Sequence, residues 1–204
     1  MEGINRCIEC DNEVFGTDSL CQSCKLKLFG NKEMEEKAIQ NYPLNNRNKD
    51  AFQSCKNFKE SNRGVYLFGP AGHGKTLIAK TIWQYMGGVV PFIKIPMLLL
   101  EIRKSFEGNG KTESEIIESC LSHPVLFMDD FAAEKVSAYT METLYIICDQ
   151  MEENGIRPFI TSNLDLKELT QRFCDRIVSR ITGMCDVVKL IDTDHRIKNR
   201  GRQL

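Results

Sequence analysis

The sequence predicts an α/β fold in which a parallel five-stranded sheet lies between two layers of helices. Short apolar segments alternate with segments that are apolar at helical spacing, and this alternation favours a parallel sheet covered on both faces. A glycine-rich octet joins the first predicted strand to a helix, and a later apolar strand ends in two acids. We expect the five strands at 65–68, 89–95, 125–129, 158–161 and 186–191.

The predicted helices occupy the segments between these strands. An amphipathic helix is expected to lead into the first strand, because Phe52, Cys55 and Phe58 recur at three-residue spacing within residues 49–61. The other helices are expected at 75–86, 96–106, 113–121, 137–154 and, as more than one helix, 165–182.

Residues 69–76 fit the pattern GxxxxGK[ST] of a phosphate-binding loop. Its glycines let the backbone curl so that successive N–H groups face phosphate oxygens. Lys75 supplies a positive charge for the β- and γ-phosphates, and the Thr76 hydroxyl is a ligand for Mg²⁺. A strand precedes the loop and a helix follows it, which favours this interpretation over an ordinary glycine turn. The expected nucleotide-binding residues are Gly69, Pro70, Ala71, Gly72, His73, Gly74, Lys75, Thr76 and Leu77.

Polar groups follow two further predicted strands. Asp129 and Asp130 end the strand that begins at Val125, and Asn163 follows the strand at 158–161. In parallel α/β sheets the ligand lies at the carboxyl ends of the strands. We therefore expect Asp129 to hold Mg²⁺, Asp130 to polarise the attacking water, and Asn163 to hydrogen-bond that water or the γ-phosphate. An acidic turn and a helix cap are the alternatives left open for these groups.

The composition is that of an ordinary globular protein. The 204 residues are 42% hydrophobic and 27% charged, with a net charge of −1, so DNA contacts would need a local basic patch. The sequence lacks an apolar run of membrane-spanning length and a secretory signal at its start. The nine cysteines accompany a nucleotide motif, which favours a reducing compartment over a disulfide framework. We expect a cytoplasmic protein that has no membrane contact.

Four of the cysteines form two CxxC pairs near the start of the sequence. Cys7, Cys10, Cys21 and Cys24 have the spacing of a tetrahedral Zn²⁺ site, with a turn-rich segment between the pairs that is suited to a hairpin. So short a segment cannot bury its own core, so the metal would provide the folding energy. Four thiolates leave no open coordination position, which predicts structural rather than catalytic zinc. Two reducible cysteine pairs are the alternative.

A pair of arginines follows the Thr-Ser-Asn strand further along the sequence. The segment DRIVSR places Arg176 and Arg180 four residues apart on one helix face. The order of phosphate loop, Asp-Asp strand, Thr-Ser-Asn strand and this arginine helix resembles the AAA+ ATPases. The stretches LFMDDFAAEK, ITSNL and DRIVSRITGMCDVVKL resemble the DnaC/DnaI helicase loaders and the related IstB-type transposition helpers.

This resemblance implies an AAA+ core without a lid domain that binds and hydrolyses ATP. It implies that Arg180, more than Arg176, acts in trans as an arginine finger on the site of a neighbouring copy, so that ATP favours self-association. Arg196 would match the family's second sensor. The chain departs from the family pattern at Asp130, where a glutamate is expected, and at Phe131-Ala-Ala-Glu134, where Leu-Gly-Ala-Glu is expected.

The predicted organisation has four parts. They are a zinc module at 1–30, a helix and linker at 31–48, the AAA+ ATPase domain at 49–197 and a basic tail at 198–204.

The function that this reading favours is an ATP-dependent loader that delivers a hexameric replicative DNA helicase onto single-stranded DNA. The zinc module would then grip the helicase or help to organise it. An IstB-type transposition helper is the first alternative, and a nucleotide kinase and a zinc-stabilised adaptor that uses ATP as a structural ligand are the others.

Overall fold

A computed structural model describes residues 5–6, 13–14, 32–106, 108, 110–133 and 136–193. The chain forms two compact units, which are described separately: residues 1–42 with 81–89, and residues 43–80 with 90–204. In the smaller unit, β1 (Asn5–Arg6) pairs antiparallel with β2 (Glu13–Val14), and α2 covers Lys32–Gln40.

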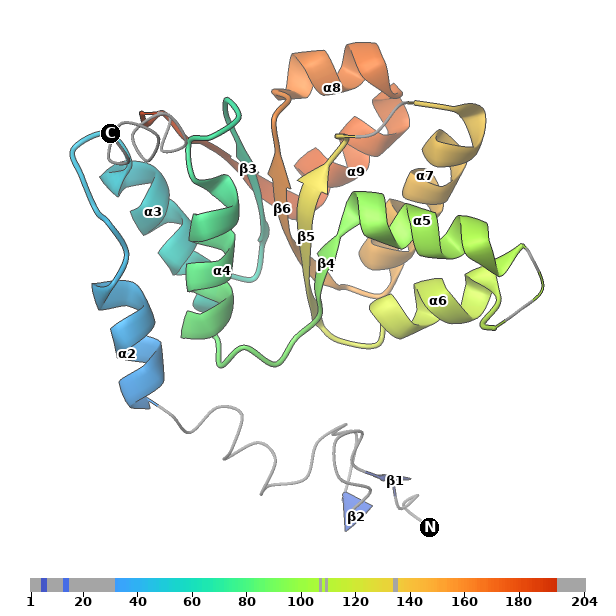
Figure 1. Ribbon diagram of the computed structural model, residues 1–204, viewed down its shortest axis with the longest axis horizontal. Coiled ribbons are helices and arrows are strands. Elements are labelled where there is room, and N and C mark those ends of the chain that lie inside the picture. The colour runs from blue at the N-terminus through green and yellow to red at the C-terminus, as the bar shows by residue number, and fades with distance from the viewer. Residues whose placement is uncertain are drawn as a thin grey trace, which may run out of the picture. The chain divides into compact units, whose positions relative to one another are not determined.

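The larger unit is built on one sheet in which every neighbouring pair of strands is parallel. The strand order is β4-β5-β6-β3-β7 (Figure 1). This confirms the predicted five-stranded parallel sheet. Because the strands are parallel, all of their carboxyl ends meet at one edge. The strands are β3 (Gly64–Phe68), β4 (Phe92–Lys94), β5 (Val125–Phe131), β6 (Arg157–Ser162) and β7 (Cys185–Lys189).

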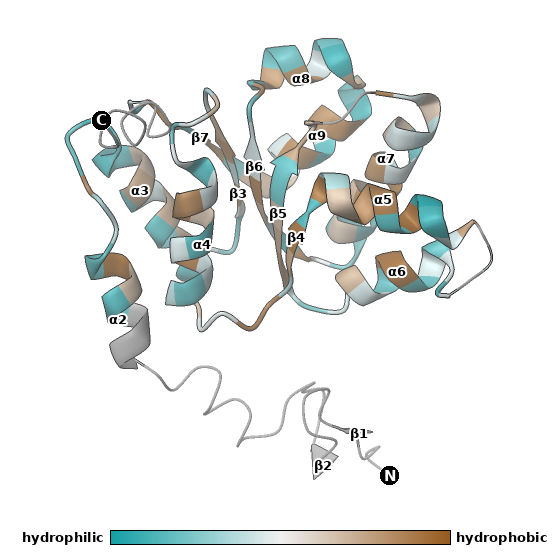
Figure 2. Cartoon of the chain, in the orientation of Figure 1, coloured by the Kyte–Doolittle hydropathy of each residue, from teal (hydrophilic) through white to brown (hydrophobic). Residues whose placement is uncertain are grey.

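Helices connect the strands in the predicted order. In the described residues they are α3 (Lys49–Lys56), η1 (Asn57–Lys59), α4 (Lys75–Tyr85), α5 (Ile95–Ser105), α6 (Glu113–Cys120), α7 (Ala138–Glu153), α8 (Leu166–Arg172) and α9 (Asp175–Met184). The helices that cover the sheet carry both hydrophilic and hydrophobic segments, as amphipathic helices do (Figure 2).

Each face of the sheet packs against its own set of helices (Figure 1). On one face the ring of Phe58, from η1, meets the rings of Phe127 and Phe159 edge to face, with centroids 5.8 Å and 5.3 Å away. On the other face, Tyr66 and Ile160 belong to a buried cluster that includes side chains of α5, α6, α7 and α9. This arrangement confirms the predicted layers of helices around the sheet.

Two predicted boundaries differ from the structure. The strand expected at 89–95 covers only Phe92–Lys94, because Pro91 has no N–H for a ladder and Pro96 lies in the first turn of α5. The segment 165–182, which was expected to hold more than one helix, contains two. It breaks at Phe173, whose φ of −114° and ψ of −116° are not helical, and the second helix continues to Met184.

Among the described residues, no helix combines the length and the apolar character needed to cross a membrane.

Candidate nucleotide site

The predicted phosphate loop joins the carboxyl end of β3 to the first residue of α4, Lys75. Gly72 and Gly74 have φ values of 80° and 90°, a conformation that glycine adopts without steric penalty. Gly69 is required for a different reason, because a Cβ atom there would lie 2.4 Å from the carbonyl oxygen of Leu190. The loop is therefore shaped by its glycines and by the segment that follows β7.

Lys75 is held inside the loop that it closes. Its Nζ donates hydrogen bonds to the carbonyl oxygens of Gly69, at 2.8 Å, and Pro70, at 2.9 Å, and the side chain is buried. A buried ammonium group is favourable only where acceptors surround it. Phosphate oxygens are acceptors of the same kind with more negative charge, so Lys75 is suited to exchange carbonyl oxygens for a phosphate.

Asp129 lies at the carboxyl end of β5 and is only 1% exposed. Its carboxylate accepts hydrogen bonds from the Thr76 hydroxyl, at 2.9 Å, and from the Thr161 hydroxyl, at 2.6 Å. A carboxylate beside a threonine hydroxyl is the oxygen-donor set that Mg²⁺ uses in phosphate-loop proteins. Thr76 and Asp129, which were predicted separately, are thus brought together at one point.

Thr161 is a site residue that the sequence reading missed. Besides holding Asp129, its hydroxyl oxygen accepts a hydrogen bond from the backbone N–H of Asp130 at 3.1 Å. Only its position in the Thr-Ser-Asn end of β6 signalled a role, because the pairing of β5 with β6 that brings it beside Asp129 is a tertiary feature.

Asp130 lies in an irregular part of β5. The register between β5 and β6 shifts between Met128 and Phe131, and Asp130 and Ala132 have φ values of 58° and 66°. Such left-handed conformations are uncommon outside glycine and concentrate at functional sites. The bulge directs Asp130 away from the regular alternation of the strand, and its side chain lines the cavity of the phosphate loop.

That cavity has a volume of about 290 Å³. Asn163 and Asp130 both line it, so the predicted water-positioning groups share a space with the predicted phosphate-binding residues. Gly69 and Pro70 contribute through their contacts with Lys75, and His73 instead contacts the segment after β7. The lining residues are Ala71, Gly72, Gly74, Lys75, Thr76, Leu77, Asp130 and Asn163.

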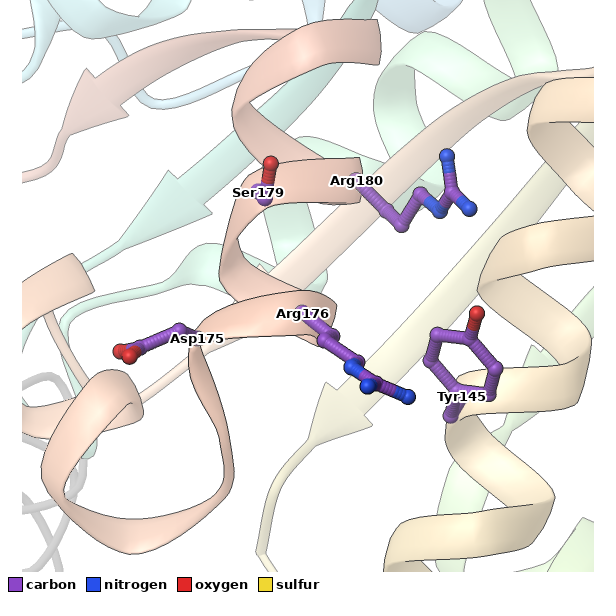
Figure 3. Close-up of a pocket in the computed structure, with 5 residues that line it drawn as sticks. All are labelled: Tyr145, Asp175, Arg176, Ser179 and Arg180. Atoms are coloured by element: carbon purple, nitrogen blue, oxygen red, sulfur yellow. The ribbon is translucent and has the colours of Figure 1, made fainter.

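The predicted arginine pair lies on α9, beside a second cavity of about 370 Å³ (Figure 3). Arg180 forms ion pairs with Asp149, at 2.5 Å, and Glu152, both on α7. A hydrogen bond to Tyr145 and the two carboxylates raise the pKa of the Arg180 guanidinium, which is protonated in any case. Arg176 is exposed and lines the same cavity. The two cavities share no lining residue, so the structure does not bring the arginines to this chain's own phosphate loop.

Several predicted site residues lie outside the described residues. These are the four zinc ligands Cys7, Cys10, Cys21 and Cys24, the second-sensor candidate Arg196, and the basic tail at 198–204. The antiparallel pair of β1 and β2 brackets the first CxxC pair in the sequence. Within the described part of the chain, no group of three or more His, Cys, Asp or Glu side chains is placed to hold a metal ion.

A sequence model of the family described as "IstB-like ATP binding protein" matches residues 18–203. The replicative helicase loader DnaC of Buchnera aphidicola subsp. Acyrthosiphon pisum (strain APS) is 22% identical over 131 residues, which is 62% of this chain and 53% of that protein. The ATPase family gene 2 protein homolog A of Homo sapiens is 38% identical over 74 residues, 35% of this chain and 8% of that protein. The matched region thus spans about half the length of the DnaC protein and a small part of the length of the human protein.

Solved structures share the fold. The crystal structure of the DnaC helicase loader superposes with a TM-score of 0.65 at 21% identity, covering 76% of this chain and 96% of that one. The crystal structure of DnaI superposes with a TM-score of 0.65 at 21% identity, covering 75% of this chain and 89% of that one. The structure of AMPPCP-bound DnaA from Aquifex aeolicus superposes with a TM-score of 0.66 at 19% identity, covering 81% of this chain and 54% of that one.

Proposed function

Because this chain belongs to the family of IstB-like ATP binding proteins, we propose that it loads a replicative DNA helicase onto single-stranded DNA. Family and fold make it an ATPase of the AAA+ class. The observation that carries the loader proposal is the extent of the shared fold. The match covers 96% and 89% of the solved DnaC and DnaI chains, but 54% of the DnaA chain.

The residues of the loop fit ATP and Mg²⁺. Bound ATP supplies the phosphoanhydride bond whose hydrolysis drives the cycle. Lys75 exchanges the carbonyl oxygens of Gly69 and Pro70 for phosphate oxygens, and Thr76 with Asp129 supplies oxygen ligands for the ion. This fit rests on a buried, hydrogen-bonded donor set that is already assembled in the chain.

Two other groups act on the attacking water. Asp130 accepts its proton or orients it, and Asn163, which lines the same cavity, donates a hydrogen bond to it. Asp130 is one methylene shorter than the glutamate of the family pattern, so its reach depends on the bulge that holds it. We infer a slow hydrolysis step, suited to a switch that is used once in each loading event.

An arginine from a second copy completes the site in this proposal. Arg180 is the candidate, with Arg176 beside it on the same helix (Figure 3). To act in trans, Arg180 exchanges the carboxylates of Asp149 and Glu152 for phosphate oxygens of its neighbour. ATP therefore favours self-association, because each nucleotide provides a partner for the adjacent copy's arginine.

The amino-terminal cysteines complete the proposal. We infer that Cys7, Cys10, Cys21 and Cys24 hold a structural Zn²⁺ ion and that the module contacts the helicase, whereas the ATPase domain contacts single-stranded DNA. Loss of zinc on chelation is expected to abolish helicase binding and to leave ATP hydrolysis intact. Zinc content by atomic absorption and a helicase pull-down before and after chelation measure both parts.

Reconstituted loading tests the whole proposal. The substrate is a DNA duplex with a single-stranded region that is coated with single-stranded DNA-binding protein. We expect ATP to increase both the amount of a hexameric replicative helicase bound to that region and the unwinding of the adjoining duplex. Lys75→Ala is expected to abolish this increase. Lys80→Ala, which removes an exposed lysine from the same helix, is the matched control and is expected to load normally.

The outcome also separates the other functions. Stimulation of a transposase, with no effect on a helicase, would assign the chain to the IstB-type helpers, which the family description favours as the second candidate. Phosphoryl transfer to a small acceptor would identify a kinase. Normal loading by Lys75→Ala would identify an adaptor that does not use ATP turnover.

A further inference from the structure

We propose that Asp192 is a positioning residue for the phosphate loop and that, through Asn48, it couples nucleotide binding to the segment at residues 43–48. This inference rests on ATP binding and not on helicase loading, so the two proposals can fail separately. It joins three parts of the larger unit that are distant in the sequence: the turn before α3, the phosphate loop, and the segment after β7.

The segment after β7 forms the outer support of the loop. The backbone N–H of Leu190 donates to the carbonyl oxygen of Phe68 at 2.8 Å, and the Leu190 carbonyl oxygen leaves no room for a side chain at Gly69. Two residues later, the backbone N–H of Asp192 donates to Nδ1 of His73 at 3.1 Å. The segment thus contacts the loop at its beginning and near its middle.

His73 accepts this hydrogen bond through a ring nitrogen that must carry no proton. Its neutral ring is therefore the Nε2–H tautomer. In the sequence His73 lies between Gly72 and Gly74, which have left-handed backbone conformations. Without side chains, the two glycines restrict their own backbone dihedral angles only weakly. A fixed His73 limits the conformations of this pair, and both glycines line the cavity of the phosphate loop.

The side chain of Asp192 is held by the turn before α3. Asp192 is 5% exposed, and its carboxylate accepts hydrogen bonds from Nδ2 of Asn48 at 2.8 Å and Nδ2 of Asn45 at 3.1 Å. The backbone N–H of Thr193 donates to the same carboxylate at 2.7 Å. Hydrogen bonds to a charged acceptor are stronger than neutral ones, so this carboxylate fixes the position of its own backbone N–H.

The turn is organised by the same two asparagines. The Asn45 side-chain oxygen accepts from the N–H groups of Arg47, at 2.8 Å, and Asn48, at 3.1 Å. The Asn48 side-chain oxygen accepts from the N–H of Asn45 at 2.8 Å, and its Nδ2 also donates to the carbonyl oxygen of Pro43 at 3.1 Å. Asn48 is fully buried, so a displacement of Asp192 disturbs the turn.

Asp192→Asn tests the positioning role. We expect the Kd and KM for ATP to rise about three- to tenfold, the effect of losing one or two hydrogen bonds that preorganise the loop, with kcat nearly unchanged. Asp186→Asn is the matched control. It makes the same change on β7 at an exposed side chain that pairs with Arg63, and its KM is expected to stay that of the wild type.

A reciprocal exchange separates positioning from simple stability. Asn48→Asp alone places two carboxylates against each other and is expected to raise KM at least as much as Asp192→Asn. The double variant Asn48→Asp/Asp192→Asn restores an amide against a carboxylate across this pair but not the hydrogen bond from residue 48 to Pro43, so its KM is expected to lie below that of Asn48→Asp without reaching the wild type. If the Asp192 variants do not fold, His73→Ala, which removes only the acceptor, is expected to give the same three- to tenfold rise.

Hydrogen exchange at the amides of Asn45, Arg47 and Asn48 tests the coupling. The non-hydrolysable analogue AMPPCP is expected to slow their exchange several-fold in the wild type and to leave it unchanged in His73→Ala. Wild-type KM in a folded Asp192→Asn or His73→Ala variant overturns the positioning role. Exchange that does not respond to AMPPCP in the wild type overturns the coupling.

Discussion

The nucleotide edge of the sheet and the arginine face formed by α7 and α9 hold their charged groups in opposite ways. Asp129 at the nucleotide edge is 1% exposed and is fixed by two threonine hydroxyls. The Arg180 side chain is 36% exposed, and its partners Asp149 and Glu152 are 28% and 38% exposed. Buried, charge-assisted hydrogen bonds hold one geometry, whereas exposed ion pairs add little stability and exchange readily.

In the proposed function, the nucleotide edge is the half of the site that is held ready, and the arginine face is the half that stays exchangeable. The phosphate loop, Asp129 and Asp130 are assembled at one edge from β3, β5 and β6. Arg176 and Arg180 line a separate cavity, and the partners of Arg180 are side chains of the same chain. Removing groups from each region is therefore expected to have distinct consequences.

The largest effect is expected from Arg180→Ala. If Arg180 acts in trans, ATP hydrolysis by the assembled protein falls by about 10³-fold, the range of an arginine finger. The folded state is expected to lose little stability, because the ion pairs are exposed. Hydrolysis measured over a range of protein concentrations, together with urea denaturation, checks both parts. Arg176→Ala, on the same helix, is the control, and loss of activity in that variant instead would move the role to Arg176.

Asp130→Asn comes next and contrasts the two neighbouring acids. Hydrolysis is expected to fall about 10²-fold, because the amide cannot accept the proton of the attacking water. ATP affinity is expected to stay within about twofold, since asparagine tolerates the left-handed conformation at a φ of 58°. Single-turnover hydrolysis and equilibrium titration measure the two quantities. A matching loss of affinity would show that Asp130 binds the nucleotide and does not act on water.

Neutralising the partners of Arg180 sharpens the comparison with a smaller effect. Asp149→Asn combined with Glu152→Gln removes both carboxylates that compete with the phosphate of a neighbouring copy. We expect ATP-dependent self-association to strengthen about threefold, in line with the small free energy of exposed ion pairs. Analytical ultracentrifugation with AMPPCP measures it. Glu153→Gln, a neighbouring exposed acid on α7, is the control, and unchanged association of the double variant would argue against competition.

The smallest effect is expected from Ala132→Gly, in the bulge of the nucleotide edge. Ala132 is buried with a φ of 66°, a conformation that costs alanine energy and glycine little. Glycine therefore relieves strain in the folded state, but it also removes a buried methyl group and gives the unfolded chain more freedom. These stabilising and destabilising effects are expected nearly to cancel. Stability is expected to change by less than about 0.5 kcal/mol. The same substitution at Ala79, in the helical α4, is expected to lose about 1 to 2 kcal/mol. Urea denaturation of both variants decides whether the bulge is strained.

The bulge also gives a physical reason for one departure from the family pattern. The sequence has Phe131-Ala-Ala-Glu134 where Leu-Gly-Ala-Glu is expected, so Ala132 occupies the position of the glycine. In the structure this residue has the backbone conformation that favours glycine. The sequence pattern pointed to the position, but only the backbone angle shows what the glycine would provide.

Patterns that act over short distances were readable from the sequence. The periodicity of apolar residues predicted the five parallel strands and most helices, because burial of one face imposes a regular spacing. The octet at 69–76 predicted the phosphate loop, because glycines and a lysine at fixed spacing are needed to wrap an anion. The same patterns predicted more than one helix at 165–182 but did not place the break at Phe173.

The sequence by itself determined the fold class and the chemical groups of the nucleotide edge, since parallel strands bring their carboxyl ends together regardless of loop detail. Tertiary structure alone decided the partners of these groups. Thr161 meets Asp129 through the pairing of β5 with β6, Arg180 meets Asp149 through the packing of α9 on α7, and Asp192 meets Asn48 across the larger unit. Each contact joins residues far apart in the chain, where neither spacing nor composition records which side chains become neighbours.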